Sequence, residues 1–260
     1  MKRIFLMSFL SLFAYLKGLT QDFSLFDKKT FTGSAGTLPY RILYPKAYDE
    51  KNVYPLVLLL HGAGERGNDN EKQLTWGASI FLNAEHRATF PCIVVIPQCP
   101  TNDYWASVKF ERTHYPLDLD FNYTYPETTA LKTAMELVED ITKRERVDKR
   151  RVYIVGLSMG GMGTFEAVFR HRDVFAAAIP ICGGADLKAY TRRVAKIPFW
   201  IFHGEKDNVV PVKHSRNIYA KLKSFEAQVK YTEYPGVGHD SWVKAFADTD
   251  FIPWLFTNKR

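Results

Sequence analysis

The sequence predicts one α/β domain with a mainly parallel central sheet and helices on both faces. Short apolar or β-branched runs alternate with helix-compatible patterns along the chain, which is the order that parallel strands require. Several runs are apolar throughout, as is typical of strands buried on both faces. The 260 residues are 46% hydrophobic and show no repeat or low-complexity linker after residue 21, so we expect a single core over residues 21–260.

The predicted strands lie at residues 41–44, 56–60, 92–97, 152–155, 176–180, 199–202 and 229–234. Between them, the spacing of apolar residues predicts helices at 73–83, 128–143, 160–171 and 212–225. Two connections, 62–91 and 100–125, are too long for simple turns, and the second is rich in aromatic residues. Long loops in compact domains are often functional, and ligands of parallel sheets bind beyond the carboxyl ends of the strands.

The first 20 residues differ from the rest and have the pattern of a secretory signal peptide. Lys2 and Arg3 precede an apolar run at residues 4–16, and small residues follow before Gln21. The run is shorter than the ~18 residues that a membrane-spanning helix needs, so we expect no stable membrane anchor. A buried N-terminal helix is the alternative. We therefore expect residues 1–20 to be removed and the mature protein to be secreted or periplasmic.

The positive charge raises the question of a nucleic-acid partner. The chain carries 35 Lys+Arg and 28 Asp+Glu, a formal charge of +7. Removal of residues 1–20 takes away Lys2, Arg3 and Lys17 and no acid, which leaves +4. The remaining basic cluster, residues 143–151, lies where a predicted helix ends, and positive charge there complements the helix dipole. With no nucleic-acid motif in the sequence, we expect no nucleic-acid partner.

The three cysteines indicate neither a disulfide framework nor a metal site. Cys92 and Cys99 flank an extended run, which at ~3.3 Å per residue holds them roughly 20 Å apart, too far to bridge. Pairing of either with Cys182 stays open, although core or loop thiols are the expectation. No spacing of cysteines and histidines suggests zinc, and we expect no cofactor.

The strongest local motif is Gly156-Leu157-Ser158-Met159-Gly160, which follows an apolar strand and precedes a predicted helix. A serine at such a tight strand-to-helix turn has a strained backbone, so its neighbours must be small. Its Oγ then projects from the edge of the sheet, and the amino end of the following helix favours developing negative charge. Ser158 is therefore the candidate nucleophile.

A nucleophilic serine needs a histidine base, and the base needs a carboxylate that orients it. His239 lies in a glycine-rich loop directly after the last predicted strand and is the favoured base. Asp207 follows the strand at 199–202 and is the favoured acid. The weaker candidates for the base are His171, His203 and His214, and those for the acid are Asp186, Glu205 and Asp240.

The oxyanion formed during acyl transfer needs backbone N–H donors. The segment from His61 to Gly64 follows the predicted strand at 56–60, at the place where such folds supply one donor. We expect the N–H groups of Ala63 and of Met159, the residue after the nucleophile, to be these donors. His61 is expected to brace the loop rather than to act as a base.

The elements LHGAGERGNDN, GLSMGG, HGEKDNVVP and GVGHDSW stand in the order found in α/β-hydrolases. Over about residues 38–256, the chain resembles compact secreted bacterial carboxylesterases related to the dienelactone hydrolase, phospholipase/carboxylesterase and feruloyl-esterase groups, a branch with a prolyl-oligopeptidase-like catalytic domain. The resemblance implies nucleophile Ser158, acid Asp207 and base His239, and a loop at residues 65–70 that shapes the oxyanion wall. Dienelactone hydrolases proper use a cysteine nucleophile, so Ser158 departs from their specific reaction.

The favoured function is a secreted serine carboxylesterase, with acylated carbohydrates or phenolic esters as candidate substrates. Trp105, in the aromatic connection, is the candidate for stacking on the substrate. The alternative is a prolyl-oligopeptidase-type serine peptidase acting on short peptides, although the chain has no room for a separate gating domain. A non-catalytic relative that binds carbohydrate is a third hypothesis. The sequence leaves the oligomeric state open.

Overall fold

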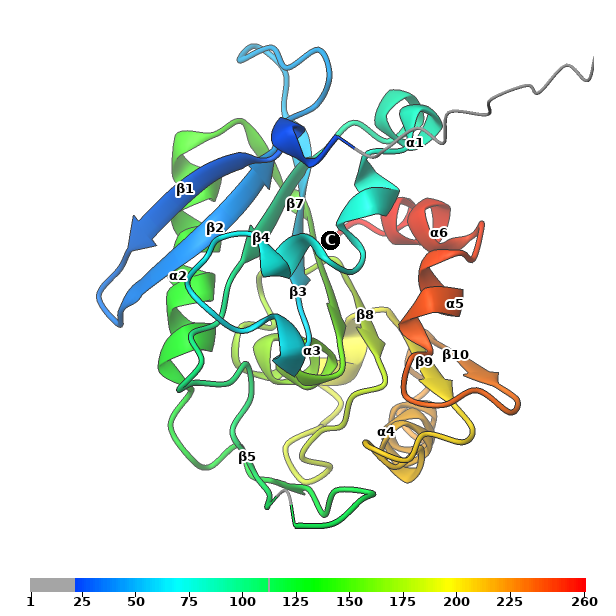
Figure 1. Ribbon diagram of the computed structural model, residues 1–260. Helices are drawn as coiled ribbons and strands as arrows, with labels where there is room; N and C mark the ends of the chain where they lie inside the picture. Colours follow the sequence, from blue (N-terminus) through cyan, green and yellow to red (C-terminus); the bar gives the residue numbers. More distant parts are fainter. Residues whose placement is uncertain (1–21, 112) are drawn as a thin grey trace, which may run out of the picture.

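A sheet of eight strands crosses the molecule in the order β1-β2-β4-β3-β7-β8-β9-β10 (Figure 1). The computed structural model describes residues 22–111 and 113–260, and the expected signal peptide lies outside them. Strand β2 is antiparallel to both neighbours, and the remaining pairs are parallel, which confirms the predicted mainly parallel α/β class. The strands are β1 (Asp27–Thr32), β2 (Thr37–Leu43), β3 (Tyr54–Leu60), β4 (Ile93–Pro97), β7 (Val147–Leu157), β8 (Ala177–Ile181), β9 (Phe199–Gly204) and β10 (Val229–Tyr234).

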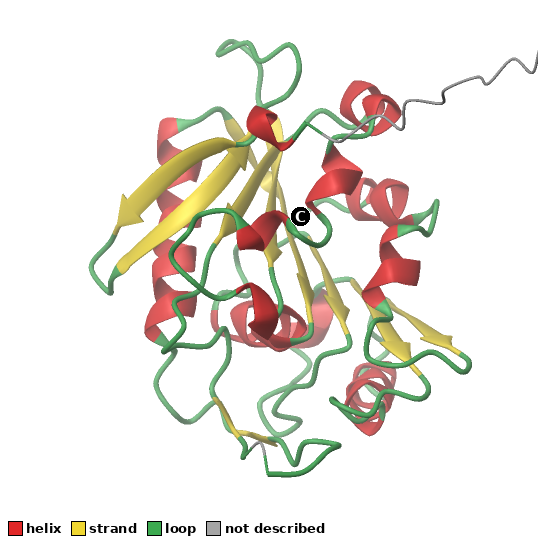
Figure 2. Ribbon diagram, in the orientation of Figure 1, coloured by secondary structure: helices red, strands yellow, loops and turns green. Residues whose placement is uncertain are grey.

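Helices cover both faces of this sheet (Figure 2). In β3, Leu56, Leu58 and Leu60 contribute to the core on one face, and Val57 and Leu59 contribute to the core on the other. The strand is apolar throughout because side chains alternate between two buried faces. The first core lies against α2 (Thr129–Arg144), α3 (Met159–Arg170) and α4 (Lys213–Lys223), and the second against α5 (Trp242–Phe246) and α6 (Phe251–Thr257).

The predicted helix at residues 73–83 is wrong. Two short 3₁₀ turns, Lys72–Leu74 and Ala78–Phe81, occupy this segment, and the helix α1 (Ala84–Thr89) begins only after it. Gly77 separates the two turns with a φ of 80°, a left-handed conformation that interrupts a right-handed helix. Asn83 caps α1, because its side chain accepts hydrogen bonds from the first turn.

The long segment that follows β4 is tied to the core by a buried carboxylate. It contains a two-stranded ribbon, β5 (Val108–Lys109) and β6 (Asp120–Phe121), which the sequence analysis did not predict. Glu166 of α3 is fully buried and accepts hydrogen bonds from the hydroxyl of Ser107 at 2.8 Å and from Arg170 at 2.7 Å. Arg170 in turn donates to the carbonyl of Tyr125 at 2.8 Å. Both ends of the segment are thereby fixed to α3.

Within residues 22–111 and 113–260, no helix has the length and apolar character that crossing a bilayer requires.

Replacement of Glu166 by alanine should destabilise the protein, because Arg170 and Ser107 would lose their shared acceptor in a buried position. We expect the free energy of unfolding to fall by about 3–5 kcal/mol, the usual cost of removing one partner of a buried ion pair. Urea denaturation followed by circular dichroism measures it. Glu139→Ala, on the exposed face of α2, is the control and should change stability by no more than about 0.5 kcal/mol. Equal urea midpoints for Glu166→Ala and Glu139→Ala would contradict the role of Glu166 in fixing the segment to α3.

Candidate active site

Ser158 lies at the turn between β7 and α3 in a strained conformation, with φ 52° and ψ −116°. Its N–H donates to the carbonyl of Ile181 at 2.8 Å, which links the turn to β8. A Cβ at Gly156 would collide with the carbonyl oxygen of Gly160, and a Cβ at Gly160 would collide with that of Leu60. These close approaches explain why the motif has glycine on both sides of the serine.

The structure brings the three predicted residues Ser158, His239 and Asp207 together. The Oγ of Ser158 lies 2.9 Å from Nε2 of His239, and Nδ1 of His239 lies 2.8 Å from Oδ2 of Asp207. The side chain of Asp207 is fully buried, whereas that of His239 is 18% exposed. Because Nδ1 faces a carboxylate, it carries the imidazole proton, and Nε2 is left free to accept the proton of the serine hydroxyl.

The carboxylate of Asp207 is held in its charged form by several donors. Its Oδ1 accepts the N–H groups of Val209 and Val210 at 2.8 and 2.9 Å, and His203 Nε2 lies 3.1 Å from its Oδ2. Burial alone would raise the pKa of Asp207, but the hydrogen bonds from His203, His239 and the backbone outweigh it and hold this pKa well below its ordinary range.

His203 supports the acid, a role that the sequence analysis missed. Its Nε2 faces two acceptors, Asp207 Oδ2 and the carbonyl of Val210 at 2.9 Å, so Nε2 carries the proton. Its Nδ1 lies 2.7 Å from the hydroxyl of Ser215, which therefore donates to it. His203 and Asp207 are four residues apart, on either side of the end of β9. This spacing is the sequence signal that could have identified the role of His203.

The loops that carry the acid and the base are joined by backbone hydrogen bonds. Lys206 N donates to Val237 O at 2.8 Å, and Glu205 N donates to Tyr234 O at 3.0 Å. The carboxylate of Glu205 accepts the N–H of Gly236 at 2.8 Å. Glu205, a weaker candidate for the acid, therefore holds the loop of the base instead.

The main rival acid, Asp186, lies elsewhere. Its carboxylate accepts the N–H groups of Tyr123 at 3.1 Å and Lys188 at 2.8 Å, and it is buried. These bonds attach Tyr123, which belongs to the aromatic-rich connection at residues 100–125, to the loop that follows β8. Asp186 thus has a structural position, and none of the described residues that hydrogen-bond to its carboxylate is a histidine.

Two of the other histidines also lie outside the group around Ser158. His171, at the end of α3, is 2.8 Å from the carboxylate of Glu127. His214 begins α4 beyond Lys213 and packs edge-on against Phe121, with ring centroids 5.4 Å apart. Neither imidazole contacts the serine hydroxyl, so the base assigned from the loop position remains the one that geometry favours.

The loop after β3 places Ala63 beside the nucleophile, and His61 braces it. Nε2 of His61 accepts the N–H of Cys99 at 3.0 Å, so its Nδ1 carries the proton and donates to the carbonyl of Gly62 at 2.6 Å. In the part of the chain that the structure describes, the N–H groups of Ala63 and Met159 donate no hydrogen bond to protein. They are available for an oxyanion.

Arg66 fixes the other end of this loop. Its guanidinium donates to the carbonyls of Ala63 at 3.1 Å, Thr101 at 3.0 Å and Asp103 at 3.2 Å. It also lies over the ring of Tyr104, 5.6 Å from the centroid. The loop with the expected oxyanion donor and the start of the aromatic segment therefore form one connected unit.

The structure does not support the stacking role predicted for Trp105. This side chain is 0% exposed and packs against His61, with ring centroids 5.4 Å apart. A ring enclosed in the core has no face for a ligand. The prediction rested on the position of Trp105 in a long aromatic connection, but the side chain is buried and packs against His61.

Other aromatic residues line the cleft at the serine. Trp76 is 37% exposed and Tyr115 is 55% exposed. Trp242 packs edge-on against His239, with centroids 5.3 Å apart, and lies 5.8 Å from Trp76. The cleft is lined by Gly62, Ala63, Gly64, Glu65, Trp76, Tyr104, Tyr115, Leu117, Leu157, Ser158, Met162, Val209, Val210, His239 and Trp242.

Cys182 adds a thiol close to the acid and the base. One possible ligand atom each from Cys182, Asp207 and His239 lies within 4.8 Å of the others. Burial raises the pKa of the Cys182 thiol well above its ordinary value, so it stays protonated, whereas a metal binds the thiolate. The hydrogen bonds of Asp207 and His239 are those of a serine–histidine–acid group, and this chemistry is favoured over metal binding.

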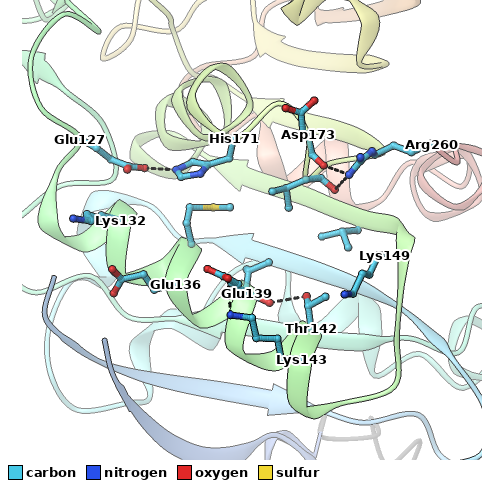
Figure 3. A pocket seen from close by; sticks show the side chains of 14 residues that line it. Glu127, Lys132, Glu136, Glu139, Thr142, Lys143, Lys149, His171, Asp173 and Arg260 are labelled. Atoms are coloured by element: carbon cyan, nitrogen blue, oxygen red, sulfur yellow. Dashed lines mark hydrogen bonds and ion pairs between the residues drawn. The ribbon is translucent and has the colours of Figure 1, made fainter. Parts of the chain in front are cut away.

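A second groove lies away from Ser158, between α2 and the start of β7 (Figure 3). Met135, Val138 and Val152 form part of its apolar lining. Two pairs of side chains around it interact: His171 with Glu127 at 2.8 Å, and Lys143 with Glu139 at 2.6 Å. Without a nucleophile or a converging set of polar groups, this groove has no features of a catalytic site.

The fold and the serine on its strand-to-helix turn define an α/β-hydrolase. The chain belongs to the phospholipase/carboxylesterase family, whose sequence model matches residues 47–253. A thermostable esterase of known structure shares 37% sequence identity with it, and the two superpose with a TM-score of 0.83 over 91% of this chain and 64% of the esterase.

Two further comparisons extend this likeness. The feruloyl esterase module from Clostridium thermocellum, solved with sinapinate, has a TM-score of 0.67 at 16% identity, over 88% of this chain and 87% of the module. This module and the present chain are similar in fold. A bifunctional acetylxylan esterase/xylanase of Neocallimastix patriciarum is 31% identical over 93 residues, 36% of this chain. The match spans only 13% of that protein.

Acidification should lower the free energy of unfolding, because His61 is buried and has a lowered pKa. Burial lowers the pKa of His61 from 6.5 to about 4, so below pH 6.5 the unfolded chain binds a proton that the folded chain does not. Stability is therefore lost as the pH falls, by up to about 2 kcal/mol between pH 6.5 and 5. Denaturant titrations across this range measure the slope. His61→Gln cannot titrate and should have a shallower slope; equal slopes would contradict the assignment.

Proposed function

We propose that this protein is a serine carboxylesterase that hydrolyses carboxylic esters through an acyl-enzyme intermediate. The observation that carries the proposal is the chain of hydrogen bonds from Ser158 Oγ through His239 to Asp207, at 2.9 and 2.8 Å. Such a chain activates a serine hydroxyl for attack on a carbonyl carbon. Membership of the phospholipase/carboxylesterase family and 37% identity to an esterase support esters as the substrates.

In the first half of the reaction, Ser158 Oγ bonds to the carbonyl carbon while its proton passes to Nε2 of His239. The carbonyl oxygen becomes an oxyanion, which the N–H groups of Ala63 and Met159 and the amino end of α3 stabilise. His239 then gives its proton to the ester oxygen as the C–O bond breaks. The alcohol leaves, and the acyl group stays on Ser158.

In the second half, water replaces the alcohol. His239 takes a proton from water, whose oxygen bonds to the acyl carbon, and the proton returns to Ser158 Oγ as the carboxylic acid leaves. The low pKa of Asp207 keeps this carboxylate charged throughout, so it stabilises the imidazolium in both halves. The steps balance with ester and water alone and require no cofactor.

We propose acylated carbohydrates or phenolic esters as substrates. The feruloyl esterase module and the acetylxylan esterase among the similar proteins support this class. In this chain, Trp76, Tyr115 and Trp242 line the cleft and offer aromatic faces, the role that the sequence analysis gave to Trp105. Flat rings and sugar faces both pack well on such side chains.

We also propose that the protein is exported and that residues 21–260 form the mature catalytic domain. The support is the basic start and apolar run of residues 1–20. Amino-terminal sequencing of the mature protein tests this cleavage, and retention of Met1 would contradict it.

Ser158→Ala should lower kcat for ester hydrolysis by about 10⁶-fold, because the acyl group has no oxygen to bond to. Hydrolysis of short-chain and phenolic esters, followed beside aminoacyl amides, measures it. Wild-type activity on amides above that on esters would favour the short-peptide hydrolase instead. Activity unchanged by the substitution would contradict the serine mechanism for either substrate.

Asp207→Asn should lower kcat by about 10⁴-fold, because an amide no longer fixes the proton on Nδ1 of His239. Asp186→Asn removes a carboxylate from the next loop and is the matched control. Its effect should appear in thermal stability rather than in kcat. The assignment of the acid fails if Asp186→Asn is the variant that loses kcat while remaining folded.

A further inference from the structure

The cleft at Ser158 contains one carboxyl group that the proposed mechanism does not use. Glu65 belongs to the turn Ala63–Glu65, the same turn that carries the expected oxyanion donor, and it lines the cleft together with Ser158 and His239. Its Oε2 would lie 2.9 Å from a Cβ built at Gly62. The carboxyl group is therefore folded back against the oxyanion loop rather than extended into solvent.

Within residues 22–111 and 113–260, Glu65 forms no ion pair with a lysine or an arginine. Among the described residues that line the cleft, there is no lysine and no arginine. The guanidinium of the adjacent Arg66 is held by the carbonyls of Ala63, Thr101 and Asp103, to which it donates. Burial raises the pKa of Glu65, and only backbone N–H groups oppose that shift.

Beyond the lining residues, a second carboxylate lies behind the base, and the guanidinium of Arg66 lies over the ring of Tyr104. The pKa of Asp207 lies well below its ordinary range, so this carboxylate is charged behind His239, and His203 Nε2 lies 3.1 Å from its Oδ2. The aromatic rings of Trp76 and Trp242 add the negative faces of their π systems to the same cleft. A cleft with aromatic faces and a carboxylate attracts cations, and it repels anions.

We propose that Glu65 determines the charge preference of this esterase, so that the cleft selects esters with a positive charge near the scissile bond and rejects esters with a carboxylate there. The inference rests on the proposed esterase function and adds a substrate preference to it. Glu65 is a specificity-determining residue and takes no part in bond breaking. Its charge acts on the substrate before and during the attack by Ser158.

Two pairs of matched esters test the preference at pH 8, several pH units above the ordinary pKa of a glutamic acid. Acetylcholine and 3,3-dimethylbutyl acetate have the same shape and differ by one positive charge. Monoethyl succinate and ethyl 4-methylpentanoate likewise differ by one negative charge. Acid release in a pH-stat gives kcat/KM for each ester. The wild type should prefer the cation over its neutral partner and the neutral ester over the anion, each by about tenfold.

Glu65→Gln keeps the shape of the side chain and removes its charge. The cation-to-neutral ratio should fall by about tenfold, and the anion-to-neutral ratio should rise by about the same factor. These two ratios decide the test, whatever the substitution does to the rates for the neutral esters. Glu139→Gln, at the distant groove of Figure 3, removes one charge elsewhere and should leave both ratios as in the wild type. Glu65→Asp retains the charge and should retain both ratios even if its rates fall.

The proposal is overturned if Glu65→Gln leaves both ratios unchanged, or if it lowers kcat/KM for all four esters by one common factor. The second result would assign Glu65 to the stability of the oxyanion loop alone. A wild-type protein that hydrolyses neither neutral ester would instead contradict the esterase function itself, which separates failure of the substrate preference from failure of the function.

Discussion

The backbone turn at Ser158 is the constraint on which the rest of the site depends. A non-glycine residue with positive φ costs about 1–3 kcal/mol and persists only where its surroundings enforce it. Here β7 occupies the middle of the sheet, and α3 packs so closely that Gly160 meets the carbonyl of Leu60. The position of the nucleophile is therefore set by core packing between β3, β7 and α3.

The acid and the base depend on a different kind of support. They follow β9 and β10 at the end of the sheet, where fewer neighbours are available to hold a loop. Backbone hydrogen bonds between the two loops, and the donors around Asp207, replace that packing. The nucleophile is thus fixed by close backbone packing between strands and helix, while the acid and base are fixed by hydrogen bonds between loops.

The central strands and the residues around Ser158 could be predicted because each signal is local. Ser158, Asp207 and His239 each follow an apolar strand, and parallel strands bring such loops to one edge. The aromatic residues that line the cleft could not be found in this way, because Trp76 and Trp242 come from segments far apart in sequence. Strand β1 was not predicted, because this exposed edge strand has too few apolar residues to show alternation. The helix predicted at residues 73–83 does not form as one helix, because Gly77 has a left-handed backbone conformation.

The three cysteines of the chain lie within the described residues, and all are buried and unpaired. Burial raises the pKa of each thiol, so that none is a reactive thiolate at neutral pH. Folding of this domain therefore requires no disulfide-forming machinery, and the folded state is insensitive to the redox potential around it.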